Sequence, residues 1–305
     1  MIYTLTTNPA VDMHITTEQL KMDTVTRTKN AALSGNGKGV NVSLVLERFN
    51  VATGVLGFFG GFTGEYIIKE CEKKVAKTIP TRIDGETRIN VFLVDQNGEY
   101  NMVNEGPAIT EKNQQELLDT IASLSDLDIL VISGSMARGA SDDYYDRIIK
   151  TVIDKKAQFV IDISSKKLKE LLKYRPLLIK PNDDEIEDIF GIKITDDKVA
   201  KDVLKMLYDM GAQNVLITMG AKGSYFYNGD SFYCCEPYPV KLKSTICAGD
   251  SFLAAFIKSR FAEKLSIEES LKFASATGAN VAEHDGIGPL DMVDVYKEKI
   301  KVKQI

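Results

Sequence analysis

The chain has 305 residues, of which 44% are hydrophobic and 27% charged, proportions that are typical of a folded globular protein. Its net charge of −5 argues against a nucleic-acid partner, because binding to a duplex normally needs a basic face. No apolar run approaches the roughly 18 residues of a membrane helix, and residues 1–20 lack the pattern of a secretory signal. We therefore expect a cytoplasmic protein without a membrane partner.

Short apolar strands alternate with helical stretches along most of the chain. Strands are expected over residues 2–5, 52–57, 129–133, 159–163, 177–180 and 215–218, and helices over residues 40–49, 64–74, 111–123, 142–156 and 198–210. Strands that are apolar on both faces belong inside a parallel sheet. The pattern predicts an α/β fold, a doubly wound and mostly parallel sheet flanked by helices, in one domain over residues 1–305. Ligands of such folds bind at the carboxyl ends of the strands.

Two segments interrupt this alternation. Residues 12–33 and 87–103 read as extended chain, and the second contains Asn97-Gly98, a strong hairpin signal. Together they predict a small β-sheet inserted into the main domain. Because a free sheet of this size is marginal unless one face is covered, we expect it to act as a lid and to pair with a second copy in a homodimer.

A glycine-rich segment over residues 34–43 places Gly37 and Lys38 just before an apolar helix that also carries Asn41. Its spacing fits neither a Walker A loop nor the dinucleotide fingerprint. A flexible backbone with one cation nevertheless suits an anionic ligand such as a phosphate. A plain turn before a helix explains this segment equally well.

The segment over residues 180–185 follows a predicted strand and opens a helix. Asn182 and Glu185 lie three residues apart, so they face the same side of the first turn. Their oxygens could hold Mg²⁺, directly or through its waters. The alternative is a capping box, in which both side chains only satisfy the backbone at the helix start.

The segment over residues 218–224 lies at the end of another predicted strand. Its hydroxyls and glycines, Thr218, Gly220, Gly223 and Ser224, could wrap the phosphates of a nucleotide. A hairpin turn into the next strand is the competing interpretation, and the two are compatible.

Near the C-terminus, small residues precede an apolar helical run. Ala248 and Gly249 would let a phosphate approach the free backbone N–H groups at the helix start. Asp250 would lie beside that phosphate as a candidate proton acceptor. The simpler alternative is that Asp250 is an ordinary N-cap.

The order of the motifs is more specific than any one of them. They are Asn8-Pro9-Ala10-Val11-Asp12, Gly37-Lys38-Gly39-Val40-Asn41, Thr87-Arg88-Ile89-Asn90, Ser133-Gly134-Ser135, Lys180-Pro181-Asn182 and Ala248-Gly249-Asp250-Ser251. With them the chain resembles, over nearly its whole length, the ribokinase-like sugar kinases of the phosphofructokinase B group. Within that group it most resembles 1-phosphofructokinases and tagatose-6-phosphate kinases.

The resemblance implies an ATP-dependent, Mg²⁺-requiring kinase for a phosphorylated ketohexose. Fructose 1-phosphate is the first expected acceptor and tagatose 6-phosphate the second, and the rival is a non-catalytic sugar- or nucleotide-binding relative. By the same resemblance Asp250 is the base, and the N–H groups of Cys247, Ala248 and Gly249 form an anion hole. The sugar site would consist of Asp12, Gly37, Lys38, Asn41, Arg88 and Asn90. The ATP and Mg²⁺ site would consist of Lys180, Asn182, Glu185, Thr218, Gly220, Gly223 and Ser224.

Two positions depart from the pattern of that group, because Cys247 and Asn36 stand where glycine is common. If position 247 needs a positive φ, a cysteine there is strained, whereas asparagine tolerates such angles better. We expect the changes to affect rate and substrate preference more than the fold. The preference for a phosphosugar depends on Arg88 and Lys38, since a second anion in the site needs cations to offset its desolvation.

Overall fold

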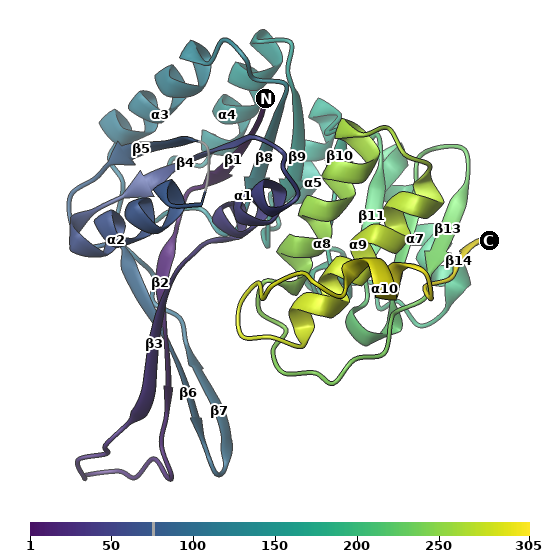
Figure 1. Cartoon of the computed structure of the whole chain (residues 1–305). Helices are drawn as coiled ribbons and strands as arrows, with labels where there is room; N and C mark the ends of the chain where they lie inside the picture. The colour runs from purple at the N-terminus through teal and green to yellow at the C-terminus, as the bar shows by residue number, and fades with distance from the viewer. Residues whose placement is uncertain (75–76) are drawn as a thin grey trace.

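The computed structural model describes residues 1–74 and 77–305 and contains two β-sheets (Figure 1). In the described residues the larger sheet has ten strands in the order β14-β13-β12-β11-β10-β9-β8-β1-β4-β5. In chain order they are β1 (Ile2–Thr6), β4 (Thr53–Phe59), β5 (Lys77–Arg82), β8 (Ile129–Ser133), β9 (Gln158–Asp162), β10 (Leu178–Ile179), β11 (Val215–Thr218), β12 (Ser224–Tyr227), β13 (Phe232–Cys235) and β14 (Val302–Gln304).

The strand pairing confirms a doubly wound, mostly parallel sheet. The neighbours from β5 through β4, β1, β8, β9 and β10 to β11 are parallel, and only β12, β13 and β14 are antiparallel additions at one edge. From β1 the chain builds outward through β4 and β5, and then restarts at β8 on the other side of β1. The order of the strands therefore reverses between β1 and β8, which is where such sheets form a ligand crevice.

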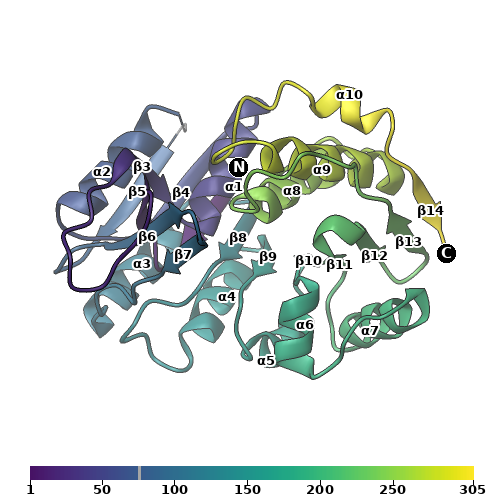
Figure 2. The same cartoon turned by 90° about the horizontal axis from the view of Figure 1, so that it is seen from below.

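Helices cover both faces of this sheet, as the view from below in Figure 2 shows. One core contains side chains of α1, α8, α9 and α10, and the other contains side chains of α3 to α7, while α2 packs in a third, smaller cluster with α1. The helices are α1 (Lys38–Arg48), α2 (Gly61–Glu72), α3 (Glu111–Ser123), α4 (Tyr144–Asp154), α5 (Leu168–Leu171), α6 (Asp183–Phe190), α7 (Asp197–Asp209), α8 (Ala248–Phe256), α9 (Ile267–Ala282) and α10 (Val293–Lys297).

The middle strands are apolar on both faces because each face meets a layer of helices. Along β8, Ile129 and Val131 belong to the core under α1 and α8, whereas Leu130 and Ile132 belong to the core under α3 and α4. Successive side chains of a strand point to opposite faces, so a continuous apolar run serves both cores. This explains why the sequence predicted the inner parallel strands β1, β4, β8, β9, β10 and β11.

The smaller sheet extends away from the rest of the molecule (Figure 1). Its order is β3-β2-β6-β7, from β2 (Ala10–Thr16), β3 (Lys29–Asn36), β6 (Arg88–Asp95) and β7 (Gly98–Met102). β6 and β7 form the hairpin predicted at Asn97-Gly98, and Gly98 adopts a φ of 140° there. The separate small sheet predicted from residues 12–33 and 87–103 is confirmed, with strands that begin at residue 10 and end at residue 102.

Some elements differ from the prediction. The edge strand β5 carries Lys77, Pro80 and Arg82 and has no apolar run, so its sequence gave no strand signal. Helix α1 begins at Lys38, two residues before the predicted start, which makes this lysine part of the first helical turn. No helix in residues 1–74 or 77–305 combines the length and the apolar content that crossing a membrane requires.

Candidate active site

The candidate site lies at the carboxyl ends of β1, β8 and β9, at the reversal of strand order. Thr6, Ser133 and Asp162 end these strands and are aligned by the register of the sheet. Helix α1 starts close to β1, and the Thr6 hydroxyl accepts a hydrogen bond from the backbone N–H of Val40 at 3.1 Å. Gly37 allows this approach, because a β-carbon there would lie 2.5 Å from Thr6 Cγ2 and its φ is 149°.

Helix α8 brings Asp250 to the same place. Cys247 is the N-cap of this helix, with a φ of 65° in the left-handed region, so the strain anticipated for a cysteine at this position is present. Asp250, in the first turn, is only 7% exposed. A β-carbon on Gly249 would lie 3.7 Å from Lys180 Nζ. The helix start, the carboxylate and a lysine therefore lie together in the structure.

A buried carboxylate connects the two predicted lysines. Asp162 is fully buried, and its Oδ1 lies 3.3 Å from Lys180 Nζ and 3.4 Å from Lys38 Nζ. Lys38 Nζ also lies 3.6 Å from Glu185 Oε1, which accepts a hydrogen bond from Ser164. Burial alone would raise the pKa of Asp162, but Lys180 and Lys38 hold it below its usual value. Asp162 therefore fixes two cations beside the head of α8.

Asp250 has the titration expected of a base near neutral pH. Burial raises the pKa of this carboxyl to about 6, and the negative charge of Asp162 adds to the effect. Lys38, Lys180 and a hydrogen bond from Asn41 act in the opposite direction. A carboxylate with a pKa near the working pH is an effective proton acceptor that is still ionised at pH 7.

A chain of hydrogen bonds joins the small sheet to Asp250. Asn90 on β6 donates to Asp12 Oδ1 at 2.8 Å, and Asn36 donates to Asp12 Oδ2. Asn41 Nδ2 donates to Asn36 Oδ1 and to Asp250 Oδ2, both at 2.8 Å. The predicted sugar residues Asp12, Asn41 and Asn90 are therefore connected to the candidate base through Asn36.

Arg88 lies at the base of the small sheet with its charge unpaired. Its guanidinium donates to the backbone carbonyls of Asn104 at 2.8 Å and Asn8 at 2.9 Å. Across the described residues, no carboxylate lies within 4.0 Å of it. Burial lowers the pKa of this guanidinium, while Asp12 raises it. A partly desolvated cation held by neutral carbonyls is suited to an anionic ligand.

The segments over residues 180–185 and 218–224 both adopt the structural alternatives considered for them. Asn182 Oδ1 accepts from the N–H of Glu185 at 2.7 Å, and Glu185 Oε2 accepts from the N–H of Asn182 at 3.0 Å, which is a complete capping box at the start of α6. In the described part of the chain, no three His, Cys, Asp or Glu side chains cluster as a metal site would require. Any Mg²⁺ would therefore need ligands beyond these side chains.

The segment over residues 218–224 forms a hairpin between β11 and β12. Thr218 ends β11 and bridges to Asn182, so the two predicted nucleotide segments are neighbours. Gly220 begins a 3₁₀ turn, and Gly223 adopts a φ of 94°, where a β-carbon would meet the Cys235 carbonyl. Ser224 is buried opposite Cys235. The backbone of this turn, rather than the Ser224 hydroxyl, is available to a ligand.

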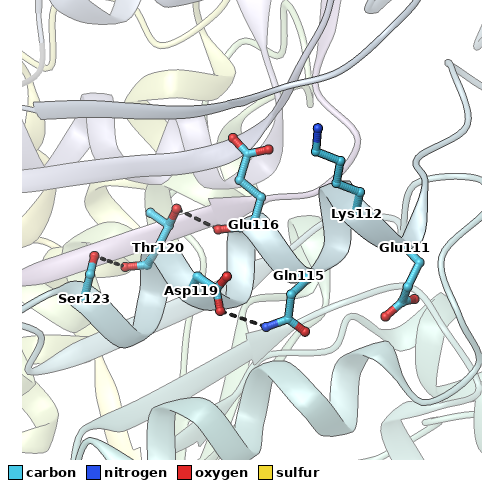
Figure 3. Close-up of a pocket in the computed structure, with 7 residues that line it drawn as sticks. All are labelled: Glu111, Lys112, Gln115, Glu116, Asp119, Thr120 and Ser123. Carbon is cyan, nitrogen blue, oxygen red and sulfur yellow. Dashed lines mark hydrogen bonds between the residues drawn. The ribbon is translucent and has the colours of Figure 1, made fainter.

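A cleft of about 1160 Å³ opens between the small sheet, α1 and the segment over residues 285–290. Asn36, Asn41 and Cys247 line it, together with His14 and Phe92 from the small sheet. A second hollow runs along the outer face of α3 (Figure 3), where its polar side chains bond mainly within the helix. None of the predicted site residues lies in that second hollow.

Sequence reasoning missed Asp162 and gave Asn36 no role. The only signal for Asp162 is an acidic residue at the end of an apolar strand, the position where α/β folds place ligand-binding groups. The partners of Asp162 lie far from it in the chain, at positions 38 and 180. Its function becomes visible only when the sheet register brings these residues together.

Comparisons with known proteins place the chain in a family. The pattern that defines the pfkB family carbohydrate kinases matches residues 6–291. The chain is 39% identical to the D-tagatose-1-phosphate kinase of Klebsiella oxytoca over 305 residues, covering 100% of both chains. It is 32% identical to the 1-phosphofructokinase of Bacillus subtilis (strain 168) over 306 residues, again covering 100% of both.

The fold is also that of solved structures. Phosphofructokinase-2 from Escherichia coli, in complex with substrates and products, superposes with a TM-score of 0.90 at 24% identity, covering 98% of each chain. At this identity the likeness concerns the fold alone. The family pattern and the two relatives identify the chain itself: it belongs to the pfkB family of carbohydrate kinases.

Proposed function

We propose that this protein transfers the terminal phosphoryl group of ATP to a hydroxyl of a ketohexose 1-phosphate. The observation that carries the proposal is Asp250, a buried carboxylate with a pKa of about 6 at the head of helix α8. Such a group removes the proton of an acceptor hydroxyl. The backbone N–H groups of Cys247, Ala248 and Gly249 stabilise the negative charge of the transferred group.

The remaining residues bind and orient the two substrates. The sequence assigned Lys38 to the sugar site, but Asp162 holds it beside Lys180, so we assign both lysines to the charge that develops on the triphosphate. The turn over residues 218–224 supports the nucleotide through its backbone. Asn182 and Glu185, whose side chains already close the capping box, would hold Mg²⁺ through its waters, and the ion would neutralise charge on the triphosphate. Asp12, Asn41 and Asn90 orient the sugar hydroxyls.

The acceptor phosphate is assigned to Arg88, whose guanidinium has no carboxylate within 4.0 Å among residues 1–74 and 77–305. Fructose 1-phosphate is the acceptor expected from the sequence, and the name of the 39% identical relative adds tagatose 1-phosphate. The two sugars differ only in the configuration at C4. Measuring ADP release with fructose 1-phosphate, tagatose 1-phosphate, the two 6-phosphates and the free ketohexoses tests the proposal. Turnover confined to free sugars, or none, contradicts it.

The pH dependence of the reaction follows from Asp250. Burial gives this carboxyl a pKa of about 6, so it is protonated and inactive below that pH and ionised above it. We expect kcat/KM for the phosphosugar to rise with pH and level off above about 6. Phosphate esters also titrate near pH 6 and contribute to the same profile. The contribution of Asp250 is the part of the profile that shifts in the Asp162→Asn variant described in the Discussion.

Replacing Arg88 with alanine should weaken binding of the phosphosugar selectively. A charge-assisted contact is worth about 1.5–3 kcal/mol, so we expect the KM for the sugar to rise about 10- to 100-fold, with the KM for ATP within about 3-fold. Steady-state kinetics with each substrate varied in turn measures both. Arg82→Ala, which removes an exposed guanidinium paired with Glu65, is the control. An equal effect on both substrates would contradict the assignment.

We also propose that the small sheet pairs with that of a second copy. Leu33 on the edge strand β3 is 50% exposed, and Met102 on β7 is 46% exposed. An uncovered sheet with apolar side chains and a free edge normally meets a partner. Light scattering should give a dimer, and Leu33→Lys should shift the equilibrium toward monomer. A monomeric parent protein would contradict this proposal.

A further inference from the structure

His14 and Phe92 line the cleft on the side of the small sheet and have no role in the function proposed above. They are register partners in the parallel pair of β2 and β6, and their rings stack with centroids 5.0 Å apart and planes at 15°. Within residues 1–74 and 77–305, neither ring nitrogen of His14 has a hydrogen-bond partner. The stack therefore presents an unused polar group to the cleft.

The register of the small sheet places this stack beside the predicted sugar residues. Asp12 pairs with Asn90 in the same way that His14 pairs with Phe92. Side chains two positions apart on a strand point to the same face, about 6.5 Å from each other along the strand. The His14–Phe92 pair is therefore the next row on the face that carries the Asp12–Asn90 row. A ligand held by one row lies within reach of the other.

The stack also fixes the imidazole of His14. Phe92 covers one face of the ring, and the register partner on β3 is Ala32, whose methyl group takes up little of the cleft. An imidazole has at least one N–H donor in either protonation state. An aromatic surface with a few fixed polar groups is the usual composition of a small-molecule site. His14 is therefore arranged to contact a ligand from a fixed position.

The order of the rows indicates which part of the acceptor His14 faces. Arg88, to which the acceptor phosphate is assigned, pairs with Ala10, in the row on the opposite side of the Asp12–Asn90 row. His14 and Arg88 are thus separated by the residues assigned to the sugar hydroxyls. The imidazole consequently faces the sugar rather than its phosphate.

Resting on the function proposed above, we propose that His14 binds the sugar part of the acceptor by hydrogen-bonding a hydroxyl next to those held by the Asp12–Asn90 row. Phe92 is a positioning residue, because it acts by holding the imidazole in place. A side chain that is held by its neighbours loses little freedom when it binds, so the contact adds affinity for the sugar.

The chain has only two histidines, which makes the contact observable by proton NMR. His14→Asn assigns the imidazole signals, and His284, whose Nδ1 lies 2.8 Å from the Asn280 carbonyl oxygen, is the internal reference. At constant pH and without ATP, fructose 1-phosphate or tagatose 1-phosphate should shift the His14 signal and leave that of His284 in place. Inorganic phosphate, which has no sugar, should leave both in place. An equal shift of His14 with inorganic phosphate would overturn the proposal.

Calorimetric titration of variants measures the size of the contact. We expect His14→Ala to raise the Kd for the phosphosugar about 10-fold, or about 1.4 kcal/mol, and His14→Asn, which keeps an N–H donor, to raise it less than about 3-fold. Phe92→Ala should also weaken binding, and because the rings touch, the double variant should lose less than the product of the single effects. The Kd for ATP should not change in any of them.

Val94→Ala is the matched control, because Val94 lines the same cleft one row farther out. It should change the Kd for the phosphosugar by less than about 2-fold. If His14→Ala weakens phosphosugar and ATP equally, or lowers the temperature of unfolding without changing either Kd, the stack is structural and the proposal is wrong.

The same measurements separate this proposal from the proposed function. A phosphosugar that binds and shifts His14 without any ADP release would contradict the proposed function and support the His14 contact. ADP release from a phosphosugar that leaves the His14 signal in place would support the function and overturn the contact. A parent protein that binds neither phosphosugar would contradict both.

Discussion

Replacing Asp250 with asparagine should lower turnover by about 10²- to 10⁴-fold, the usual contribution of a positioned general base. The amide keeps the shape of the carboxyl and can still accept the hydrogen bond from Asn41, but it cannot take a proton. Stability should not fall. Burial raises the pKa of Asp250 to about 6, so its ionised form opposes folding above that pH, and a neutral side chain removes the penalty.

The measurements for this variant are turnover under saturating substrates and thermal unfolding at pH 8. Asp188→Asn is a matched control, because it makes the same change on the exposed face of α6. The control should leave both quantities unchanged. Near-parental turnover in Asp250→Asn would remove this residue from the role of base, whatever the effect on stability.

Replacing Asp162 with asparagine should have the largest effect on stability. The fully buried carboxylate lies between Lys38 and Lys180. Losing its charge leaves the buried Lys180 ammonium without this partner, and breaking a buried ion pair in this way typically costs about 3–5 kcal/mol. We expect the free energy of unfolding in urea to fall by about this amount and the KM for ATP to rise, because Lys180 loses the Asp162 carboxylate and Lys38 keeps only Glu185.

The same variant has an effect on pH dependence that a general loss of stability would not produce. The charge of Asp162 raises the pKa of Asp250, so its removal should move the acidic limb of kcat/KM below pH 6. Asp209→Asn, which breaks an exposed pair with Lys205, is the control and should change stability by less than about 1 kcal/mol. An acidic limb that stays in place would show that the two carboxylates do not interact.

The main sheet could be predicted from the sequence because its inner strands are buried on both faces. The run of apolar residues in β8 is a direct consequence of two helical layers. The edge strand β5 could not be predicted in this way, since its pairing with β4 rather than its composition makes it a strand. The local sequence pattern indicates which residues are buried, but it does not indicate which strand an edge strand pairs with.

The candidate site was partly predictable for a similar reason. Glycines at Gly37 and Gly249 and the acid at Asp250 stand in recognisable local settings at helix starts. Asp162 and Asn36 do not, because their roles come from partners that only the fold brings near them. The capping box at Asn182 and Glu185 shows the converse limit, since one pattern fits both a helix start and an ion site.

The aligned ends of β1, β8 and β9 have a consequence for how this chain tolerates changes of length. Thr6, Ser133 and Asp162 lie side by side across the sheet because they are register partners in neighbouring strands. One inserted residue within β9 would turn Asp162 to the opposite face of the sheet and separate it from both lysines. The exposed loop over residues 17–28, at the far tip of the small sheet, carries no such constraint. Insertions and deletions among related sequences should therefore accumulate at that tip and be absent from the inner strands.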